Sequence, residues 1–344
     1  MSGELVLAVD GGNSKTDLAL LRPGGEVVAL VRGGQSSPHH IGVEGCLDLL
    51  EDLLERAVAE AGCPNDGRPV AGVGHVLLAG VDFPSEEEEL RVAAQRRMLA
   101  ERLSVANDSF AVLRAGTEKG WGVAVVCGAG INCVGVSPDG RHARFPALGP
   151  ITGDWGGGYD VGLAALAAAA RSEDGRGPKT TLEQAVPEHF GLSAPSAVGE
   201  SIHRERIDRS RVVELAPIVL AEAARDAVAR EIVERLTDEV VALVRVALER
   251  LELTDSPAEV ILGGGLTRSA DGRLTTAVQT GLKEIAPAAI VRTASAPPIV
   301  GAALLALDEL GAGHEAQARL RQELSRRVEE LEARRKEAVS WNTA

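Results

Sequence analysis

Short apolar runs separated by glycine-rich turns dominate the first third of the chain, which predicts strands with tight connections. The expected strands cover Leu5–Asp10, Asp17–Leu21, Val27–Arg32 and Val73–Ala79. Apolar residues also recur every three to four positions, a spacing typical of amphipathic helices. Helices are therefore expected over Val43–Ala61 and Ser85–Leu103.

One arrangement of strand, glycine turn, strand and Pro/Gly turn occurs twice. It is found in VLAVDGGNSKTDLALLRPGGE (residues 6–26) and again in VAVVCGAGINCVGVSPDGR (residues 123–141). A recurrence of this kind predicts a duplicated lobe. Two such hairpins facing one another could hold a triphosphate from both sides.

Beyond Gly149 the pattern becomes mainly helical. The expected elements are helices over Val161–Ala170 and Arg211–Leu253, the latter broken at Pro217, then a strand over Glu259–Leu262 and a core helix over Pro298–Leu310. Residues 311–344 predict a charged helix with a thin apolar stripe formed by Leu320, Leu324, Val328 and Leu331. That stripe could cover the protein's own surface or a partner subunit, so the sequence leaves a homodimer open.

Composition narrows the classes of function. The 344 residues suffice for two lobes with separate cores, and a formal net charge of −14 opposes binding to nucleic acid. Cys46, Cys63, Cys127 and Cys133 show no metal-ligand spacing, so reduced cytosolic thiols are expected. The first residues resemble no secretory leader, and no apolar run reaches the ~18 residues of a membrane helix. We therefore expect a cytoplasmic protein that does not bind membranes.

The first candidate site is the turn after the first strand. It reads Asp10, Gly11, Gly12, Asn13, Ser14, Lys15 and Thr16. Glycines expose main-chain N–H groups to phosphate oxygens, the following side chains add donors, and Asp10 could hold Mg²⁺ through water. An ordinary Asp-Gly hairpin turn is the alternative. The turn is not a Walker A loop, because it lacks the GKT/GKS ending.

Two further glycine turns follow strands. One comprises Gly128, Ala129, Gly130 and Asn132, and it gains weight because it repeats the first turn. The other comprises Gly263, Gly264 and Gly265, where adenine or ribose could rest on bare backbone near a helix N-terminus. A plain strand-to-helix turn is the alternative for the second of these.

Two aspartates are candidates for catalysis on, or binding of, a substrate that carries hydroxyl groups. Asp108 in Asn107-Asp108-Ser109 could accept a hydroxyl proton during phosphoryl transfer, although the pattern alone favours a cap of the following helix. Asp154 follows Gly153 in a flexible segment and could bind sugar hydroxyls, with helix capping as the alternative. The acidic run Glu86–Glu89 is interpreted as the first turn of a capped helix, and His39-His40 as a polar loop.

In this order, the motifs from Leu5 to Leu310 resemble the N-acetylglucosamine kinase group of the BadF/BadG/BcrA/BcrD-type ATPases, in the actin-like superfamily. The resemblance implies an α/β fold of two duplicated lobes with an interlobe cleft. It assigns residues 1–115 to the first lobe, 116–311 to the second, closed by Pro298–Leu310, and 312–344 to a separate charged helix.

The resemblance also implies roles for individual residues. Residues 11–16 and 128–132 become the two phosphate loops, residues 263–265 the adenosine segment, and Asp108 the catalytic base. The substrate-binding residues that it implies are Ser37, Gly80, Asn107, Asp108, Gly153 and Asp154. The chain departs from the family at Asn13 and Ser14, at Ser37 in place of an Asn, and at Cys127 and Ala129 in place of Ser or Thr.

We therefore expect ATP-dependent, Mg²⁺-assisted phosphorylation of a hexose or amino sugar at the 6-hydroxyl. One alternative is the ATPase activator of a 2-hydroxyacyl-CoA dehydratase, which would need cysteines at a dimer interface to hold an iron–sulfur cluster. A second is a non-catalytic sugar- or nucleotide-sensing protein. A chaperone or filament ATPase is disfavoured by the short chain, which has no room for a peptide-binding domain.

Overall fold

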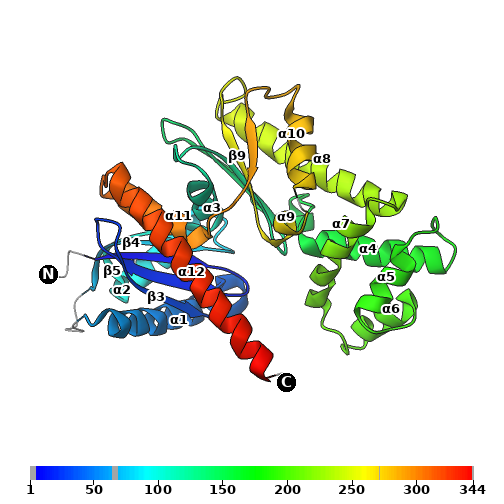
Figure 1. Cartoon of the computed structure of the whole chain (residues 1–344), viewed down its shortest axis with the longest axis horizontal. Helices are drawn as coiled ribbons and strands as arrows, with labels where there is room; N and C mark the ends of the chain where they lie inside the picture. The colour runs from blue at the N-terminus through cyan, green and yellow to red at the C-terminus, as the bar shows by residue number, and fades with distance from the viewer. Residues whose placement is uncertain (1–4, 64–68, 271, 343–344) are drawn as a thin grey trace. The chain divides into compact units, whose positions relative to one another are not determined.

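The computed structural model (Figure 1) describes residues 5–63, 69–270 and 272–342, with side chains as far as Arg335. The chain divides into two compact units, which we describe separately. Unit 1 comprises Met1–Gly120 and Ala294–Ala344, and unit 2 comprises Trp121–Thr293.

Unit 1 is built on a five-stranded sheet with the order β3-β2-β1-β4-β5. Its strands are β1 (Val6–Gly11), β2 (Thr16–Leu21), β3 (Val27–Gly33), β4 (Ala71–Leu78) and β5 (Ala100–Asn107). The helices are α1 (Pro38–Ala61), α2 (Pro84–Arg96), α3 (Ser109–Gly116), α11 (Pro298–Glu309) and α12 (His314–Asn342). Strands β1, β4 and β5 are parallel, whereas β2 is antiparallel to both β1 and β3. Buried residues of α1 and α2, such as Leu50 and Leu90, share a core with Leu7 and Val9 of β1.

Unit 2 repeats this topology. Its strands are β6 (Gly122–Cys127), β7 (Ile131–Val136), β8 (His142–Arg144), β9 (Glu259–Gly263) and β10 (Ile290–Thr293). They lie in the order β10-β9-β6-β7-β8. When the strands of each unit are numbered 1 to 5 along the chain, both sheets have the order 3-2-1-4-5, read from opposite edges. The duplication predicted from the two hairpin sequences is therefore confirmed.

The helices of unit 2 are mostly inserted between β8 and β9. They are α4 (Gly158–Glu173), α5 (Leu182–His189), α6 (Pro195–His203), α7 (Ala216–Glu222) and α8 (Ala227–Arg250), followed after β9 by α9 (Gly265–Ser269) and α10 (Arg273–Leu282). Short 3-10 helices cover Gly149–Ile151 and Arg209–Leu215. The predicted helix Arg211–Leu253 therefore breaks at Pro217, as expected, and a second time before α8, where the Asp226 side chain accepts a hydrogen bond from Ala229 N.

The predicted helix Ser85–Leu103 is wrong in its second half. Helix α2 ends at Arg96, Met98 adopts a left-handed φ of 53°, and the chain then enters β5. Leu103, Val105 and Asn107 of β5 are buried at alternate positions, as in a strand with one face on a core. A positive φ at a non-glycine residue leaves no clear signal in a sequence.

Helix α11 packs within unit 1 and not in the second lobe to which residues 116–311 were assigned. A Cβ added at Gly301 would lie 1.8 Å from the carbonyl oxygen of Ala111 in α3, so the two helix backbones touch. The division at residue 311 is corrected accordingly, because the chain returns to unit 1 at Ala294.

Helix α12 covers the exposed edge of the unit 1 sheet. Of its four stripe residues, Leu320, Leu324 and Val328 are buried on the protein's own surface and Leu331 is half-buried, which answers the question left open by the sequence. Glu323 accepts a hydrogen bond from Val27 N (3.4 Å), and Arg327 donates one to Val27 O (2.7 Å). These side chains satisfy backbone groups that an edge strand would otherwise present to another chain.

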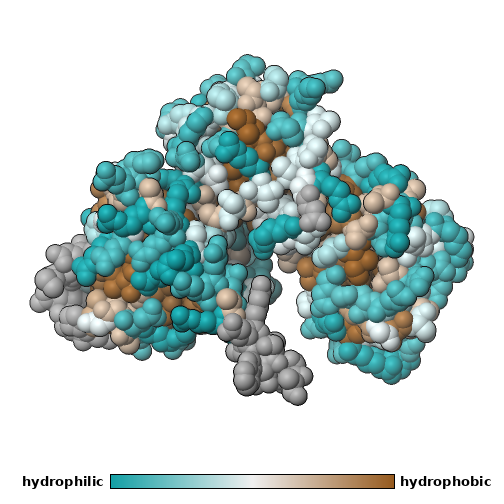
Figure 2. Space-filling model, in the orientation of Figure 1, coloured by the Kyte–Doolittle hydropathy of each residue, from teal (hydrophilic) through white to brown (hydrophobic). Residues whose placement is uncertain are grey.

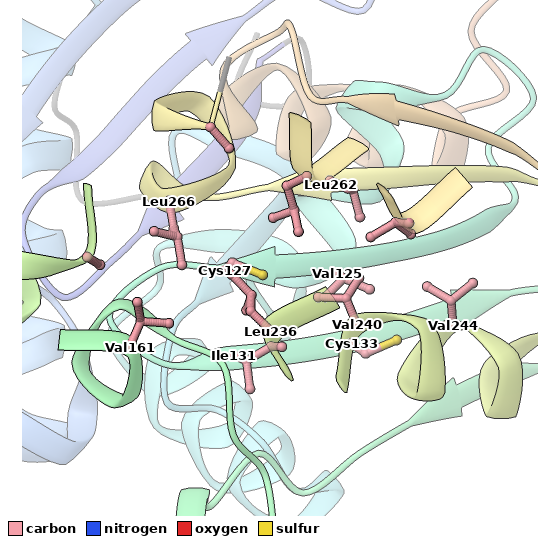
Figure 3. Close-up of a cluster of buried hydrophobic side chains, with 14 of the residues drawn as sticks. Val125, Cys127, Ile131, Cys133, Val161, Leu236, Val240, Val244, Leu262 and Leu266 are labelled. Atoms are coloured by element: carbon pink, nitrogen blue, oxygen red, sulfur yellow. The ribbon is translucent and has the colours of Figure 1, made fainter. Parts of the chain in front are cut away.

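Cys127 and Cys133 point into the hydrophobic core of unit 2 (Figure 3), among Val125, Leu236 and Val240. Burial raises the pKa of the Cys127 thiol to about 12, so it stays protonated at neutral pH. Neither thiol lies where an iron–sulfur cluster shared between subunits could reach it.

The face of the molecule in Figure 2 is largely hydrophilic. Within the described part of the chain, no helix combines the length and apolar character needed to cross a bilayer.

Candidate active site

Three parallel strands of unit 1 end side by side. In the register of the sheet Gly11 of β1 pairs with Leu78 of β4, and Leu78 pairs with Asn107 of β5. The chain beyond these strand ends stays connected, because Ala79 N donates to Gly11 O (2.8 Å) and Asp108 N donates to Leu78 O (3.2 Å). The first phosphate loop, the 79–82 loop and Asp108 therefore meet at one edge of the sheet, where α/β folds commonly bind ligands.

The predicted first phosphate loop is a tight turn, and neighbouring side chains leave no room for a Cβ at its first glycine. Gly12 N donates to Lys15 O (2.8 Å), which closes the turn. A Cβ on Gly11 would lie 2.2 Å from Ser36 Oγ and 2.4 Å from Leu78 Cδ2. Asn13 and Ser14 are exposed at the tip, where their polar groups can reach a ligand. Thr16 is buried instead, and its hydroxyl donates to Gly34 O (2.8 Å), so this side chain supports the loop from inside.

A charged cluster lies beneath this loop. The buried Asp17 accepts hydrogen bonds from both Nε and Nη2 of Arg32, the latter at 2.8 Å. Lys15 Nζ lies 3.2 Å from Asp17 Oδ2 and 3.5 Å from Glu332 Oε1 of α12. The Lys15 side chain is 38% exposed, and its ammonium is held between these two carboxylates.

Asp10 carries a raised pKa of about 8. Burial contributes most, followed by the negative charges of Asp17 and Asp108, and Lys15 and Arg32 offset them only in part. A carboxylate with this surplus of negative neighbours favours a bound cation. No cluster of three or more acidic, His or Cys ligands that could hold a metal is found among the described residues. One carboxylate suits Mg²⁺, which keeps several waters and takes its other ligands from phosphates.

Asp108 occupies the N-cap position of α3, yet its side chain makes no capping hydrogen bond. Asn107 takes over that task, because its Oδ1 accepts from Ser109 N (2.9 Å) and Ser109 Oγ (2.5 Å). The alternative interpretation of Asp108 as a helix cap therefore does not fit this geometry. Burial raises the pKa of Asp108 to about 7, with a further contribution from the charge of Asp82 and a partial offset from backbone N–H groups.

The predicted sugar-binding residues of unit 1 gather beside these aspartates. Gly80 has a φ of +76°, and a Cβ there would lie 2.7 Å from Ser37 Oγ and 3.2 Å from the His39 ring. His39 belongs to the first turn of α1, so the expectation of a polar loop at this residue is wrong. Asn107 and Ser37 are both buried, at 3% and 1% exposure, and Asn107 makes side-chain hydrogen bonds to protein groups.

The family resemblance placed Asp82 only as the last residue of a loop, residues 79–82, that lines the sugar cleft, and assigned it no individual role. The structure places it next to Asn107. Asn107 Nδ2 donates to Asp82 Oδ1 at 2.9 Å. The available signal was the position of Asp82 in the loop that follows a predicted buried strand, where functional side chains often lie. The acidic residue Glu86 is confirmed as part of a helix start, because its carboxylate accepts from Asp82 N and Phe83 N.

In unit 2 the other two glycine segments lie against each other. A Cβ on Gly264 would lie 2.2 Å from Cys127 O, and Gly264 has a φ of +96°. The N-terminus of α4 closes on the same loop, because Gly158 N donates to Gly128 O (2.8 Å) and Tyr159 N to Ala129 O (2.9 Å). Ala129 and Gly130 remain exposed. Unit 2 thus presents bare backbone at the carboxyl ends of β6 and β9.

Asp154 lies in the exposed segment that leads into α4. Its backbone N donates to Gly149 O (3.0 Å), and its carboxylate accepts a hydrogen bond from the Thr152 hydroxyl. Gly153 precedes it with a φ of +83°, and Trp155 follows under the guanidinium of Arg235, 4.0 Å from the ring centroid. Asn132 Oδ1 accepts from Cys133 N (2.7 Å) at the start of β7.

Two sheets of the same strand order, each ending in glycine loops, define the actin-like ATPase fold. The chain belongs to the BadF/BadG/BcrA/BcrD ATPase family, whose profile matches residues 7–306. Among solved structures it is similar to a candidate N-acetylglucosamine kinase of Chromobacterium violaceum, with a TM-score of 0.69 and 24% identity over 89% of this chain and 100% of that one. A ROK family glucokinase of Streptomyces griseus shares the fold at a TM-score of 0.53, with 16% identity over 88% of this chain and 99% of that one.

Two curated relatives are similar in sequence. An N-acetylmuramic acid/N-acetylglucosamine kinase of Clostridium acetobutylicum is 27% identical over 262 residues, which cover 76% of this chain and 85% of the relative. An N-acetyl-D-glucosamine kinase of Dictyostelium discoideum is 26% identical over 319 residues, which cover 90% of this chain and 99% of the relative.

Proposed function

We propose that this protein is an ATP-dependent sugar kinase that phosphorylates the 6-hydroxyl of an amino sugar. N-acetylglucosamine is the first candidate for that substrate. The observation that carries the proposal is the Asp108 carboxylate, which caps no helix and lies at the strand ends that also bear the first phosphate loop. Family membership and the two curated relatives, both named as kinases of N-acetylglucosamine, support the choice of reaction.

In this proposal Asp108 accepts the proton of the sugar hydroxyl as that oxygen attacks the terminal phosphorus of ATP, and the bond from this phosphorus to the bridging oxygen breaks, so that ADP leaves. Lys15 and the main chain of the glycine loops bind the phosphates, and Asp10 would hold Mg²⁺ through water. When bound, Mg²⁺ would neutralise negative charge on the transferred phosphoryl group. Ser37, Gly80, Gly153 and Asp154 are the proposed contacts for the sugar. Reduced thiols and the use of ATP support a cytoplasmic location.

The test is a panel of acceptors with Mg²⁺ and ATP. N-acetylglucosamine, glucosamine, N-acetylmuramic acid and glucose are offered separately, and the product is identified by phosphorus NMR and mass spectrometry. We expect a 6-phosphate of at least one acetylated sugar. ATP hydrolysis that is independent of every sugar would contradict the proposal.

The pKa of Asp108 predicts the acid limb of the pH profile. A general base acts only when deprotonated, so kcat/KM, which reports the free enzyme, should fall about tenfold per pH unit below pH 7. An unperturbed Asp would place that fall near pH ~4. Initial rates at subsaturating sugar between pH 5 and pH 9 check this, with the coupling enzymes in excess at every pH. A flat profile of kcat/KM down to pH 5 would contradict a raised pKa of Asp108.

A further inference from the structure

A hydrogen-bonded chain runs from the start of α2 to the start of α3. Glu86 Oε2 accepts hydrogen bonds from Asp82 N (2.8 Å) and Phe83 N (3.0 Å), which fixes the backbone of Asp82 against α2. The Asp82 carboxylate then accepts from Asn107 Nδ2 (2.9 Å). Asp82 is therefore held at its backbone and engaged at its side chain.

Asn107 transmits this constraint to the next helix. Its Oδ1 accepts from both the backbone N and the hydroxyl of Ser109, the first residue of α3. The side chain is buried, so its amide depends on these partners and not on solvent. Asp108 lies between Asn107 and Ser109, and both of its neighbours are thus fixed.

We propose that Asp82 is a positioning residue, which holds the Asp108 carboxylate in place through Asn107. This inference rests on the proposed kinase function. Without Asp82, the buried Nδ2 of Asn107 loses this acceptor, and rotation of the amide would release Ser109 N. The first turn of α3 would then move the base. A displacement of about 1 Å at a reacting group can cost on the order of 10²-fold in rate.

The direct test separates kcat from KM in Asp82→Ala and Asp82→Asn. In Asp82→Ala we expect kcat to fall about 10- to 100-fold, with KM for ATP and for the sugar within about twofold. Asp82→Asn keeps an oxygen that can accept from Asn107, so kcat should stay within about threefold of the wild type. Asp52→Ala, an exposed Asp of the same unit that pairs with Arg56, is the control and should match the wild type.

A double-mutant cycle identifies the path of the effect. If Asp82 acts through Asn107, Asp82→Ala combined with Asn107→Ala should be no slower than Asn107→Ala alone. Additive losses would overturn the proposed path. Should Asp82→Ala fail to fold, Asp82→Ser, which is too short to reach Asn107, takes its place.

Other outcomes are equally decisive. A wild-type kcat in Asp82→Ala, a loss confined to the KM of the sugar, or an equal loss in Asp82→Asn would each overturn the positioning role. The second result would make Asp82 a sugar ligand, and the third would assign the effect to its charge. A wild-type protein that phosphorylates no sugar overturns the proposed function itself. An active wild type with a fully active Asp82→Ala overturns this inference alone.

Discussion

Asp108→Asn is expected to lower kcat for sugar phosphorylation about 10³- to 10⁴-fold, near the upper end of what a general base contributes. The amide fills the same space but cannot accept the hydroxyl proton. Nucleotide affinity should change little, because the phosphate loops are intact. Turnover by the coupled assay and nucleotide binding by calorimetry measure the two effects. Near-normal turnover in this variant would remove Asp108 from the mechanism.

The same substitution should stabilise the ligand-free protein at pH 8. The pKa of Asp108 rises on folding from 3.8 to about 7, so between these values the folded state binds more protons than the unfolded state. Stability from this group is complete below pH ~4 and is lost as pH rises through about 7. Asparagine does not ionise, so the Asp108→Asn protein does not lose stability in this way as pH rises. Thermal unfolding at pH 4 and pH 8 should show a gain only at the higher pH, which also excludes misfolding as the cause of inactivity.

Much of the fold follows from local patterns in the sequence. The two hairpins were predictable because in each a glycine turn separates two short apolar runs, and at Gly11 a side chain would also collide with its neighbours. The identical strand order of the two sheets then follows from the repeat. Asp10 was found because it lies at the end of a strand that an apolar run defines, whereas Asp108 follows β5, whose first residues were predicted as helix, and its role came from the family resemblance.

What the sequence did not show depends on contacts between distant segments. The Asp82–Asn107 hydrogen bond joins residues 25 positions apart, and it exists because β4 and β5 pair in parallel. Residues 100–103 were assigned to a helix, so this pairing was not available to sequence reasoning. The packing of α11 on α3 is likewise a long-range contact, and a glycine in an apolar helix does not reveal its partner.

Gly301→Ala is expected to destabilise the protein by about 3 kcal/mol or more, the upper range for overpacking. The added Cβ would lie 1.8 Å from Ala111 O, 2.7 Å from Ala111 C and 2.8 Å from Ala115 N, all backbone atoms of α3. No rotamer change relieves such a clash, so the helices must separate. The gain in helix propensity of about 1 kcal/mol does not offset it. Urea or thermal unfolding measures the change.

Gly199→Ala provides the matched control. Gly199 also lies within a helix, α6, but a Cβ there would meet nothing within 4 Å, so this change should be neutral or stabilise by up to about 1 kcal/mol. An equal response of the two variants would contradict close packing of α11 on α3. Because α3 begins directly after Asp108, the folded fraction of Gly301→Ala should also lose kcat, whereas Gly199→Ala should keep it. The glycine far from the reacting atoms then affects catalysis because it sets how close α11 comes to the helix that follows the base.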